Sequence, residues 1–225
     1  HIAVLDINEQ AGKALENELN AKLGAKRVKF LPCDVSNDDQ LLSCFKAVVD
    51  DQGYLDVVIN NAAIMNDSLR TYRKEILLNL TALVTSTLES MAIMGKDKGG
   101  KGGTVINISS VASLCQSPIF PIYFGTKSAV TQFSNCIGMN EYYSKTGVRV
   151  VSVCFGATET PLLNNCTLEH FNNDVITESA AQGVVDAFKL AESGSTWLST
   201  SNRPVRDITA TVQKAYGILS ELVFQ

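Results

Sequence analysis

Short apolar runs alternate along this chain with longer amphipathic stretches. The runs predict buried strands, and they cover residues 1–6, 27–31, 55–59, 104–108, 148–155 and, more weakly, 196–199. Apolar residues at helical spacing predict helices, which cover 9–23, a stretch from 36 or 37 onward, 69–94, 123–145 and 178–192. Strands that alternate with helices indicate βαβ units, and therefore a parallel sheet with helices on both faces.

Residues with known capping preferences mark several helix ends. Asn8 can cap the first helix at its start, and Gly24 can end that helix. Gly147 can end the helix that contains Tyr123. The Gly- and Lys-rich segment 95–103 predicts a solvated loop, whereas the amphiphilic tail that follows the weak last strand receives no element.

A polar residue or a glycine follows the apolar part of each main strand. These residues are Asp6, Asp34, Asn60, Ser110 and Gly156. In a parallel sheet the carboxyl ends of the strands meet at one edge, where ligands bind. The sequence therefore predicts a binding site along this edge.

Composition excludes several classes of function. The 225 residues carry a net charge of -4 without an extended basic cluster, so nucleic acid is not an expected partner. No apolar run approaches about 20 residues, so no membrane span is expected. Two histidines at opposite ends of the chain predict no metal site. The six cysteines lack C-x-x-C spacing, and they indicate buried thiols in a reducing, cytoplasmic compartment.

Tyr123 and Lys127 form the most informative pair of polar residues. Four residues apart on a helix, they share one face. A nearby ammonium favours the phenolate and lowers the pKa of the phenol. A shift from about 10 to about 7, roughly 4 kcal/mol, would make Tyr123 a useful acid or base, and Ser110 could hold a substrate oxygen at the same point. Taken alone, such a pair would more often decorate a solvated helix.

The surrounding motifs identify a family resemblance over nearly the whole chain. In order, the motifs are Asp34-Val35, Asn60-Asn61-Ala62-Ala63, Asn79, Ser110, Tyr123-x-x-x-Lys127 and Gly156-x-Thr158-x-Thr160. With this order and spacing the chain resembles the short-chain dehydrogenases/reductases. It looks most like the branch of hydroxyprostaglandin dehydrogenase and insect alcohol dehydrogenase. The resemblance implies a single Rossmann-type domain over 1–225, with a doubly wound parallel sheet that binds a dinucleotide.

The resemblance also implies the roles of four catalytic residues. Tyr123 would exchange the hydroxyl proton of the substrate, and Lys127 would lower the pKa of Tyr123 and bind the nicotinamide ribose. Ser110 would orient the substrate oxygen. Asn79 would hold a water that relays protons from Lys127, although a satisfied polar residue in a buried helix explains Asn79 equally well.

The cofactor-binding residues follow from the same resemblance. They are Asp6, Ile7, Asp34, Val35, Asn60, Ala62, Tyr123, Lys127, Gly156, Thr158 and Thr160. Asp34 would bind the adenine amine, although it could equally cap the next helix. Asn60 would tie neighbouring strands, and Thr158 and Thr160 would meet the nicotinamide and the phosphates. Asp6 would accept hydrogen bonds from the adenosine ribose and repel a 2′-phosphate, which predicts NAD over NADP; a simple helix cap is the alternative.

Three departures from the family pattern stand out. Ala63 replaces the usual Gly, and Phe155 replaces the usual Pro before Gly156. Nothing in the sequence matches the Gly-rich turn G-x-x-x-G-x-G that follows the family's first strand. We therefore expect a chain that lacks its N-terminal strand, with a gap between two halves of the sheet and weak dinucleotide binding.

The function implied is an NAD-dependent dehydrogenase that interconverts a secondary or lipid-like alcohol and its ketone. Segments 114–122 and 161–174 would line the substrate pocket. Apolar surface around 80–91 and 130–137 would form a homodimer or homotetramer, although core packing explains these residues as well. The alternative is a catalytically silent relative that serves as a binding or scaffold protein.

Overall fold

The structure, a computed structural model, describes residues 1–164 and 175–223. In chain order the elements are β1 (Ile2–Asp6), α1 (Glu9–Leu23), β2 (Val28–Pro32), α2 (Asp38–Gln52), β3 (Val57–Asn60), α3 (Tyr72–Ile76), a π-helical turn (Leu77–Thr81), α4 (Ala82–Met94), a 3-10 turn (Lys96–Lys98), β4 (Gly103–Ser110), a second 3-10 turn (Val111–Ser113), α5 (Pro121–Ile137), α6 (Asn140–Thr146), β5 (Val148–Phe155), α7 (Pro161–Asn164), α8 (Thr177–Leu190), β6 (Thr196–Ser199), β7 (Arg206–Asp207) and α9 (Thr209–Val223).

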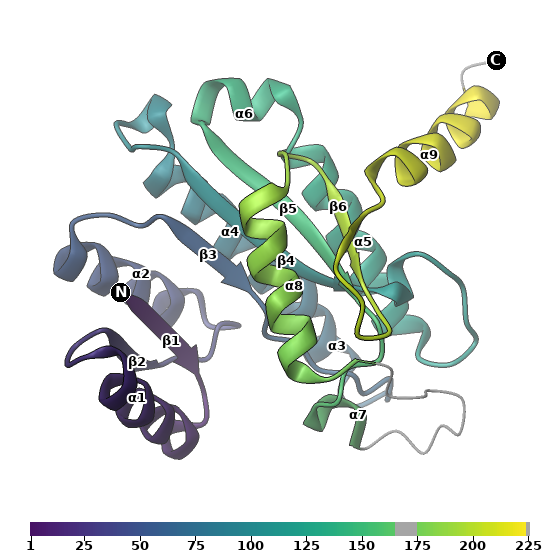
Figure 1. Ribbon diagram of the computed structural model, residues 1–225. Coiled ribbons are helices and arrows are strands. Elements are labelled where there is room, and N and C mark those ends of the chain that lie inside the picture. The colour runs from purple at the N-terminus through teal and green to yellow at the C-terminus, as the bar shows by residue number, and fades with distance from the viewer. Residues whose placement is uncertain (165–174, 224–225) are drawn as a thin grey trace.

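The strands form two sheets (Figure 1). β1 and β2 pair in parallel, and separately β3, β4, β5 and β6 form a parallel sheet that the antiparallel β7 completes at its edge. α8 lies in front of the larger sheet in Figure 1, and α4 and α5 lie behind it. The predicted α/β architecture with a doubly wound parallel sheet is therefore confirmed.

Alternating side chains of the central strands supply both core layers. Ile106 and Ile108 of β4 join a buried cluster with Ala187 of α8, whereas Val105 joins Met91 of α4 in a second cluster on the opposite face. Strands buried on both faces have continuous apolar sequences, which is why the sequence alone predicts β4 and β5. β5 and β6 have the predicted bounds.

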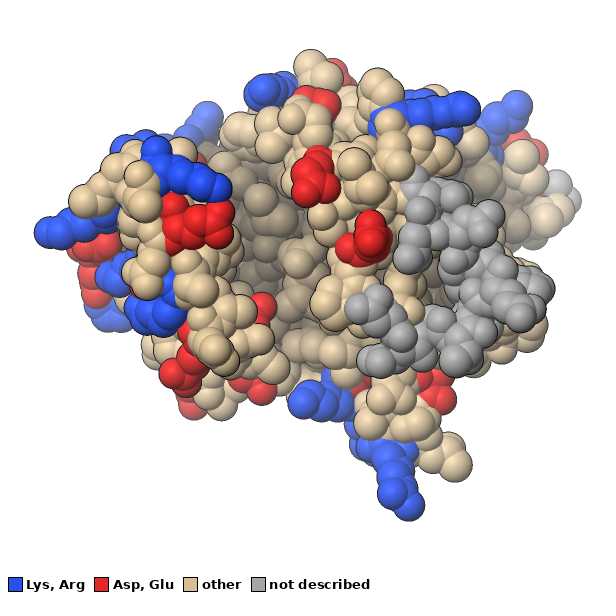
Figure 2. Space-filling view, turned by 60° about the horizontal axis from the view of Figure 1, so that its bottom comes forward, with Lys and Arg blue, Asp and Glu red and all other residues tan. Residues whose placement is uncertain are grey.

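A cavity of about 510 Å³ separates the two sheets. Its lining includes Ile2 and Leu5 of β1, Ile59 of β3 and Leu41 of α2; we call it the inter-sheet cavity. Among the described residues, neither β1 nor β3 has a strand partner on this side. No residue of β1 is fully buried, and Ile2 and Ile59 are about half exposed, at 50% and 51%. The expected gap between two halves of the sheet is confirmed, and Figure 2 shows the surface hollowed between the N-terminal part, at the left, and the rest.

α2 is the main link across this gap. Leu41 and Phe45 of α2 pack with Cys33, which follows β2, and with Val58 of β3. Apolar contact on one face of α2 therefore joins the two halves below the inter-sheet cavity, while their strands remain apart.

Two predicted helices differ from the observed ones. The helix predicted over 123–145 is broken, because α5 ends at Ile137 and α6 begins at Asn140. A Cβ on Gly138 between them would meet backbone nitrogen of Gly194 at 2.4 Å, so this glycine allows a close backbone approach that sequence periodicity cannot reveal. The helix predicted over 69–94 begins only at Tyr72.

The helical stretch Tyr72–Met94 is long and apolar enough, by length and composition alone, to cross a membrane. Leu83, Met91 and Met94 of α4 are nevertheless buried, and the helix contacts β3 and β4. These contacts identify a core helix, so the match is weak evidence for a membrane span.

Two further findings concern the surface. Cys115 and Cys136 are exposed, which corrects the expectation of buried thiols, while Cys33 and Cys154 are buried as expected. Cys166 lies outside the described residues.

The C-terminal tail, for which the sequence pattern predicted no helix or strand, forms β7 and α9. α9 projects away from the body of the domain in Figure 1.

Gly12 provides a test of how α1 packs on β2. A Cβ at Gly12 would lie 2.0 Å from a ring carbon of Phe30, whereas a Cβ at Gly217 in α9 would meet no atom of the described residues within 4 Å. Gly12→Ala should lower the free energy of unfolding by about 1–3 kcal/mol through overpacking. The matched Gly217→Ala should raise it by up to about 1 kcal/mol through helix propensity. Urea unfolding measures both, and equal effects would contradict this packing.

Candidate functional site

The carboxyl end of β4 meets α5 at the pair that dominates the sequence motifs. Lys127 Nζ donates a hydrogen bond to the carbonyl oxygen of Ile108 at 2.9 Å, and it lies 5.7 Å from the centre of the Tyr123 ring. Lys127 is 3% exposed and Tyr123 is 8% exposed. The structure therefore places a buried ammonium beside a nearly buried phenol, as the four-residue spacing predicts.

Hydrogen bonds fix α5 on the sheet at this point. Ser109 Oγ donates to the backbone oxygen of Lys127 at 3.0 Å and lies 2.8 Å from Thr131 Oγ1. Ser110 is the last residue of β4 and follows its apolar part, as predicted. Its Oγ accepts the amide hydrogen of Ala112 at 3.1 Å, which holds the hydroxyl at the turn that leaves the strand.

Asn79 lies in the π-helical turn, where an extra residue widens the helix. Such turns are rare and occur often at functional sites. Both ends of the Asn79 amide bind Ile64: Oδ1 accepts from the Ile64 amide and Nδ2 donates to the Ile64 carbonyl, each at 2.8 Å. Nδ2 also reaches Thr126 Oγ1 at 3.3 Å, and Thr126 Oγ1 donates to the Tyr123 carbonyl at 2.8 Å. Asn79 is thus connected to the helix turn that carries Tyr123.

The electrostatics of the pair follow from burial. Desolvation lowers the pKa of Lys127 to about 8, because a buried ammonium loses its hydration. Burial raises the pKa of the nearby Cys154 thiol, which therefore stays neutral. Lys127 is still largely cationic at neutral pH, although it can release its proton more readily than an exposed lysine.

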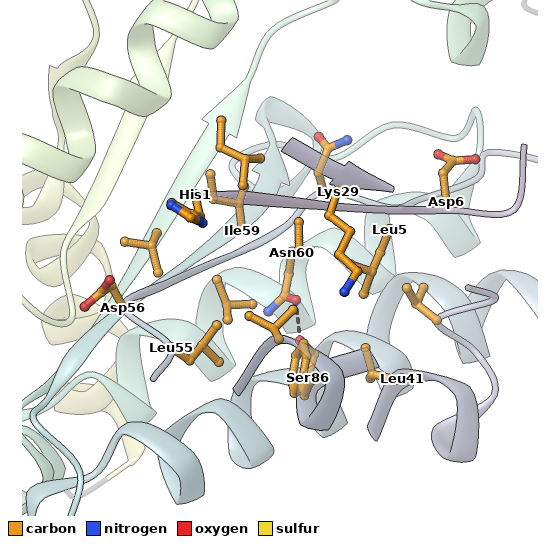
Figure 3. A pocket seen from close by; sticks show the side chains of 18 of the residues that line it. His1, Leu5, Asp6, Lys29, Leu41, Leu55, Asp56, Ile59, Asn60 and Ser86 are labelled. Atoms are coloured by element: carbon orange, nitrogen blue, oxygen red, sulfur yellow. Dashed lines mark hydrogen bonds between the residues drawn. The ribbon is translucent and has the colours of Figure 1, made fainter. Parts of the chain in front are cut away.

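Part of the predicted cofactor site lines the inter-sheet cavity. Asp6, Val35, Asn60 and Ala62 all contribute to its wall. Figure 3 shows Asp6 at one end of the cavity and Asp56 at the other. Tyr123, Lys127 and Ser110 are not part of this wall, so the predicted site residues form two groups along the sheet edge.

Asn60 ties the elements around the cavity together. Its Nδ2 donates to Asn107 Oδ1 of the neighbouring β4 at 2.8 Å and to Thr87 Oγ1 at 3.2 Å. Its Oδ1 accepts from Ser86 Oγ of α4 at 2.6 Å, the dashed contact in Figure 3. The expected link between neighbouring strands is confirmed, and it also fixes α4.

The carboxylates at the ends of the first two strands, Asp6 and Asp34, accept hydrogen bonds from the turns that follow them. Asp6 Oδ1 accepts the amide hydrogen of Asn8 at 2.8 Å, and Asn8 itself caps α1. Asp34 Oδ1 accepts from both the amide and the hydroxyl of Ser36, which lowers the pKa of Asp34. The caps of α1 and α2 are asparagines, so neither acid is the N-cap that the alternatives proposed. Ile7 is 70% exposed.

The residues after β5 form a compact turn. Thr158 Oγ1 donates to the Gly156 carbonyl at 3.0 Å, and Thr160 Oγ1 donates to the Thr158 carbonyl at 3.3 Å. Of the predicted substrate segment 161–174, the part from 165 onward lies outside the described residues.

The sequence alone does not predict three polar residues that lie near the site. Thr126 lies inside the Tyr-x-x-x-Lys motif, and it links Asn79 to the backbone of Tyr123. Asp67 accepts amide hydrogens from the first turn of α5, and Glu75 is fully buried beside it. The Asp67 contacts span 55 and 56 residues, so no local pattern could have found them.

Comparisons with known proteins show the family and the fold of the chain. A family model described as short chain dehydrogenase matches residues 1–170. Alcohol dehydrogenase 1 of Ceratitis cosyra is 38% identical over 161 residues, 72% of this chain and 60% of that protein. The 15-hydroxyprostaglandin dehydrogenase [NAD(+)] of Rattus norvegicus is 32% identical over 168 residues, 75% of this chain and 62% of that protein. The chain therefore spans about 60% of the length of these relatives.

A solved structure shares the fold. The crystal structure of 3-ketoacyl-(acyl-carrier-protein) reductase from Brucella melitensis, complexed with NADH, matches with a TM-score of 0.78. The match covers 90% of this chain and 87% of that chain at 16% sequence identity, so it establishes a common fold.

Lys127 offers a test of the buried ammonium. Its pKa falls from 10.5 to about 8 on folding, so between these values the unfolded chain binds more protons and wild-type stability rises with pH. Lys127→Met should therefore be more stable than wild type at pH 7, by about 1–3 kcal/mol. This advantage should shrink at about pH 9.5.

Denaturant unfolding at both pH values measures the effect. Lys46→Met, at an exposed lysine that pairs with Asp50, is the matched control and should change stability by no more than about 0.5 kcal/mol. A Lys127→Met advantage that does not vary with pH would contradict the buried cation.

Proposed function

The chain belongs to the short-chain dehydrogenase family of oxidoreductases, and we propose that the whole protein uses NAD to interconvert a secondary alcohol and its ketone. The observation that carries this proposal is the buried ammonium of Lys127 beside the Tyr123 ring, at the carboxyl end of β4. A cation beside a phenol favours the phenolate. The pair thus has the chemistry that removal of a proton from an alcohol requires.

In this proposal each catalytic residue has one task. Tyr123 takes the hydroxyl proton of the alcohol, or returns it to the ketone, as general base or acid. Ser110, at the end of β4, donates a hydrogen bond to the same substrate oxygen and fixes its position. Asn79, bound to Thr126 and through it to the Tyr123 turn, keeps this segment in place and leads protons from Lys127 toward solvent.

The described residues fit the two ends of a dinucleotide. When bound, NAD would supply the hydride acceptor. Asp6 ends β1 at the rim of the inter-sheet cavity, where its carboxylate can accept from the adenosine ribose and repel a 2′-phosphate. Val35, Asn60 and Ala62 line the same cavity, and Asp34, Ile7, Gly156, Thr158 and Thr160 complete the proposed set around the sheet edge.

We propose that one more parallel strand occupies the inter-sheet cavity in the whole protein. Among the described residues neither facing edge, β1 or β3, has a strand partner there, and unmet buried hydrogen bonds cost about 1–3 kcal/mol each. The turn after such a strand would lie between the Asp6 and Tyr123 groups, where a dinucleotide needs amide donors for its phosphates.

The proposal names a class of substrate and a kind of assembly. The names of the relatives support an alcohol, including a lipid-like one. We also propose a homodimer or homotetramer through α4 and α5. Four apolar residues of these helices, Leu83, Met91, Val130 and Ile137, are buried in the core, so the contact would use their exposed side chains. Leu88, which is 47% exposed, remains available for such a contact.

The reaction is tested on the whole protein with a panel of secondary alcohols. NADH formation should be detectable, and faster than NADPH formation with NADP. Tyr123→Phe removes the exchangeable proton and should lower kcat by about 10²–10⁴-fold. Tyr143→Phe, at a 42% exposed tyrosine of α6, is the matched control and should behave as wild type. No turnover by wild type would instead favour a silent binding or scaffold protein.

The proposed strand is tested by cofactor affinity. Calorimetric titration with NAD should show binding at least about 100-fold weaker for residues 1–225 alone than for a protein extended upstream, since the phosphate donors would be missing. Equally tight binding by both would refute a strand in the inter-sheet cavity as a requirement for the cofactor.

A further inference from the structure

The first turn of α5, which carries Tyr123, has no cap of its own. The first amide groups of a helix lack partners within the helix and need an acceptor from elsewhere. Phe120 occupies the N-cap position, where its side chain has no acceptor to offer, and its φ of 56° is in the left-handed region. Pro121 has no N–H, and the Phe124 amide binds the Phe120 carbonyl at 3.0 Å. The amides of Ile122 and Tyr123 remain to be satisfied.

Asp67 satisfies both of them from a distant part of the chain. Its Oδ2 accepts the amide hydrogen of Ile122 at 2.6 Å, and its Oδ1 accepts that of Tyr123 at 3.2 Å. A carboxylate here is also favoured by the positive end of the helix dipole. One side chain thus holds the backbone of the residue proposed as the acid/base.

Glu75 of α3 lies behind Asp67 in an unusual environment. Glu75 is fully buried, and its Oε2 accepts the amide hydrogen of Asn66 at 3.3 Å. Oε1 of Glu75 has no hydrogen-bond partner among the described residues, and Asp67 is close enough to raise the pKa of the Glu75 carboxyl. A protonated Glu75 can donate a hydrogen bond from this carboxyl to an oxygen of Asp67, whereas an ionised Glu75 can only accept.

We propose that Glu75 donates a hydrogen bond to Asp67 and that this acid pair positions the first turn of α5, making Asp67 a positioning residue for Tyr123. The consequence for catalysis rests on the proposed function of Tyr123, whereas the pair itself does not. Desolvation, and then the charge of Asp67, raise the pKa of Glu75 to about 7, which agrees with a proton held at Glu75.

The positively charged side chains near the pair make contacts with other groups. Arg73 stacks on Tyr72 at 5.1 Å, and Lys74 acts on Asp34. On α5, Lys127 binds the Ile108 carbonyl. In residues 1–164 and 175–223, no salt bridge reaches either acid of the pair, whether from these cations or from Arg70.

Ionisation of Glu75 should loosen this arrangement. The neutral form of Glu75 is favoured by the fold, so the pair is intact below about pH 7 and is lost as the pH rises through that value. Two adjacent carboxylates then repel one another, and Asp67 holds the amides of Ile122 and Tyr123 less tightly.

Amide hydrogen exchange in the whole protein tests the pair without any need for activity. In Asp67→Ala, which removes the acceptor, the exchange of Ile122 and Tyr123 should be about tenfold faster than in wild type at pH 6, as expected for a lost helix cap. Glu75→Gln keeps a donor for Asp67, so both amides should stay protected, and the protection should no longer fall above pH 7. Asp39→Ala, in the first turn of α2, is the matched control and should exchange as wild type does.

Two results would overturn the proposal: wild-type protection of both amides in Asp67→Ala, or the same pH dependence of protection in Glu75→Gln and wild type. If Asp67→Ala does not fold, the Glu75→Gln titration decides alone. In an active protein Asp67→Ala should lower kcat with little change in KM. If the whole protein proves to have no dehydrogenase activity, the exchange results still decide whether the acid pair exists.

Discussion

A buried ammonium group beside a phenol is the constraint on which the proposed site depends. Lys127 gives up hydration, and its pKa falls to about 8 as a result. That cost is tolerated because β4 and α5 are held in register by Ser109 and by the Ile108 carbonyl that accepts from Lys127. A destabilising buried group of this kind is typical of functional sites, where some stability is lost to keep a reactive arrangement.

The sheet determines where this chemistry can act. The carboxyl ends of parallel strands meet at one edge, which brings Asp6, Asn60 and Ser110 to the same side of the domain although they lie far apart in sequence. Residues of the proposed adenosine end line the inter-sheet cavity, whereas Ser110, Tyr123 and Lys127 of the proposed nicotinamide end lie outside its wall. In the proposal, the strand that would fill this cavity would therefore also contribute to cofactor binding.

Local signals in the sequence predicted much of the fold. The helix Glu9–Leu23 and its caps Asn8 and Gly24 were predicted correctly, because capping acts within a few residues. The helix break at Gly138 was missed, because it depends on contact with Gly194 across the fold. The π-helical turn at Asn79 was missed for a related reason, since helical periodicity does not reveal one inserted residue.

The candidate site divides in the same way. Tyr123 and Lys127 follow from helix geometry, so their meeting could be predicted. The acceptors that hold them could not: Asp67 lies 56 residues before Tyr123, and the Ile108 carbonyl belongs to another element. Side chains that perform chemistry leave a sequence motif, whereas the groups that position them are found only once the chain is folded.

The effect of Lys127 on the phenol can be measured directly. In the whole protein, labelled at the tyrosine Cζ carbon, the ¹³C shift of Tyr123 reports the phenolate as pH is raised. Below about pH 8, where Lys127 is still cationic, the buried ammonium predicts a larger phenolate fraction in wild type than in Lys127→Met. Equal phenolate fractions in the two proteins over this range would contradict the account.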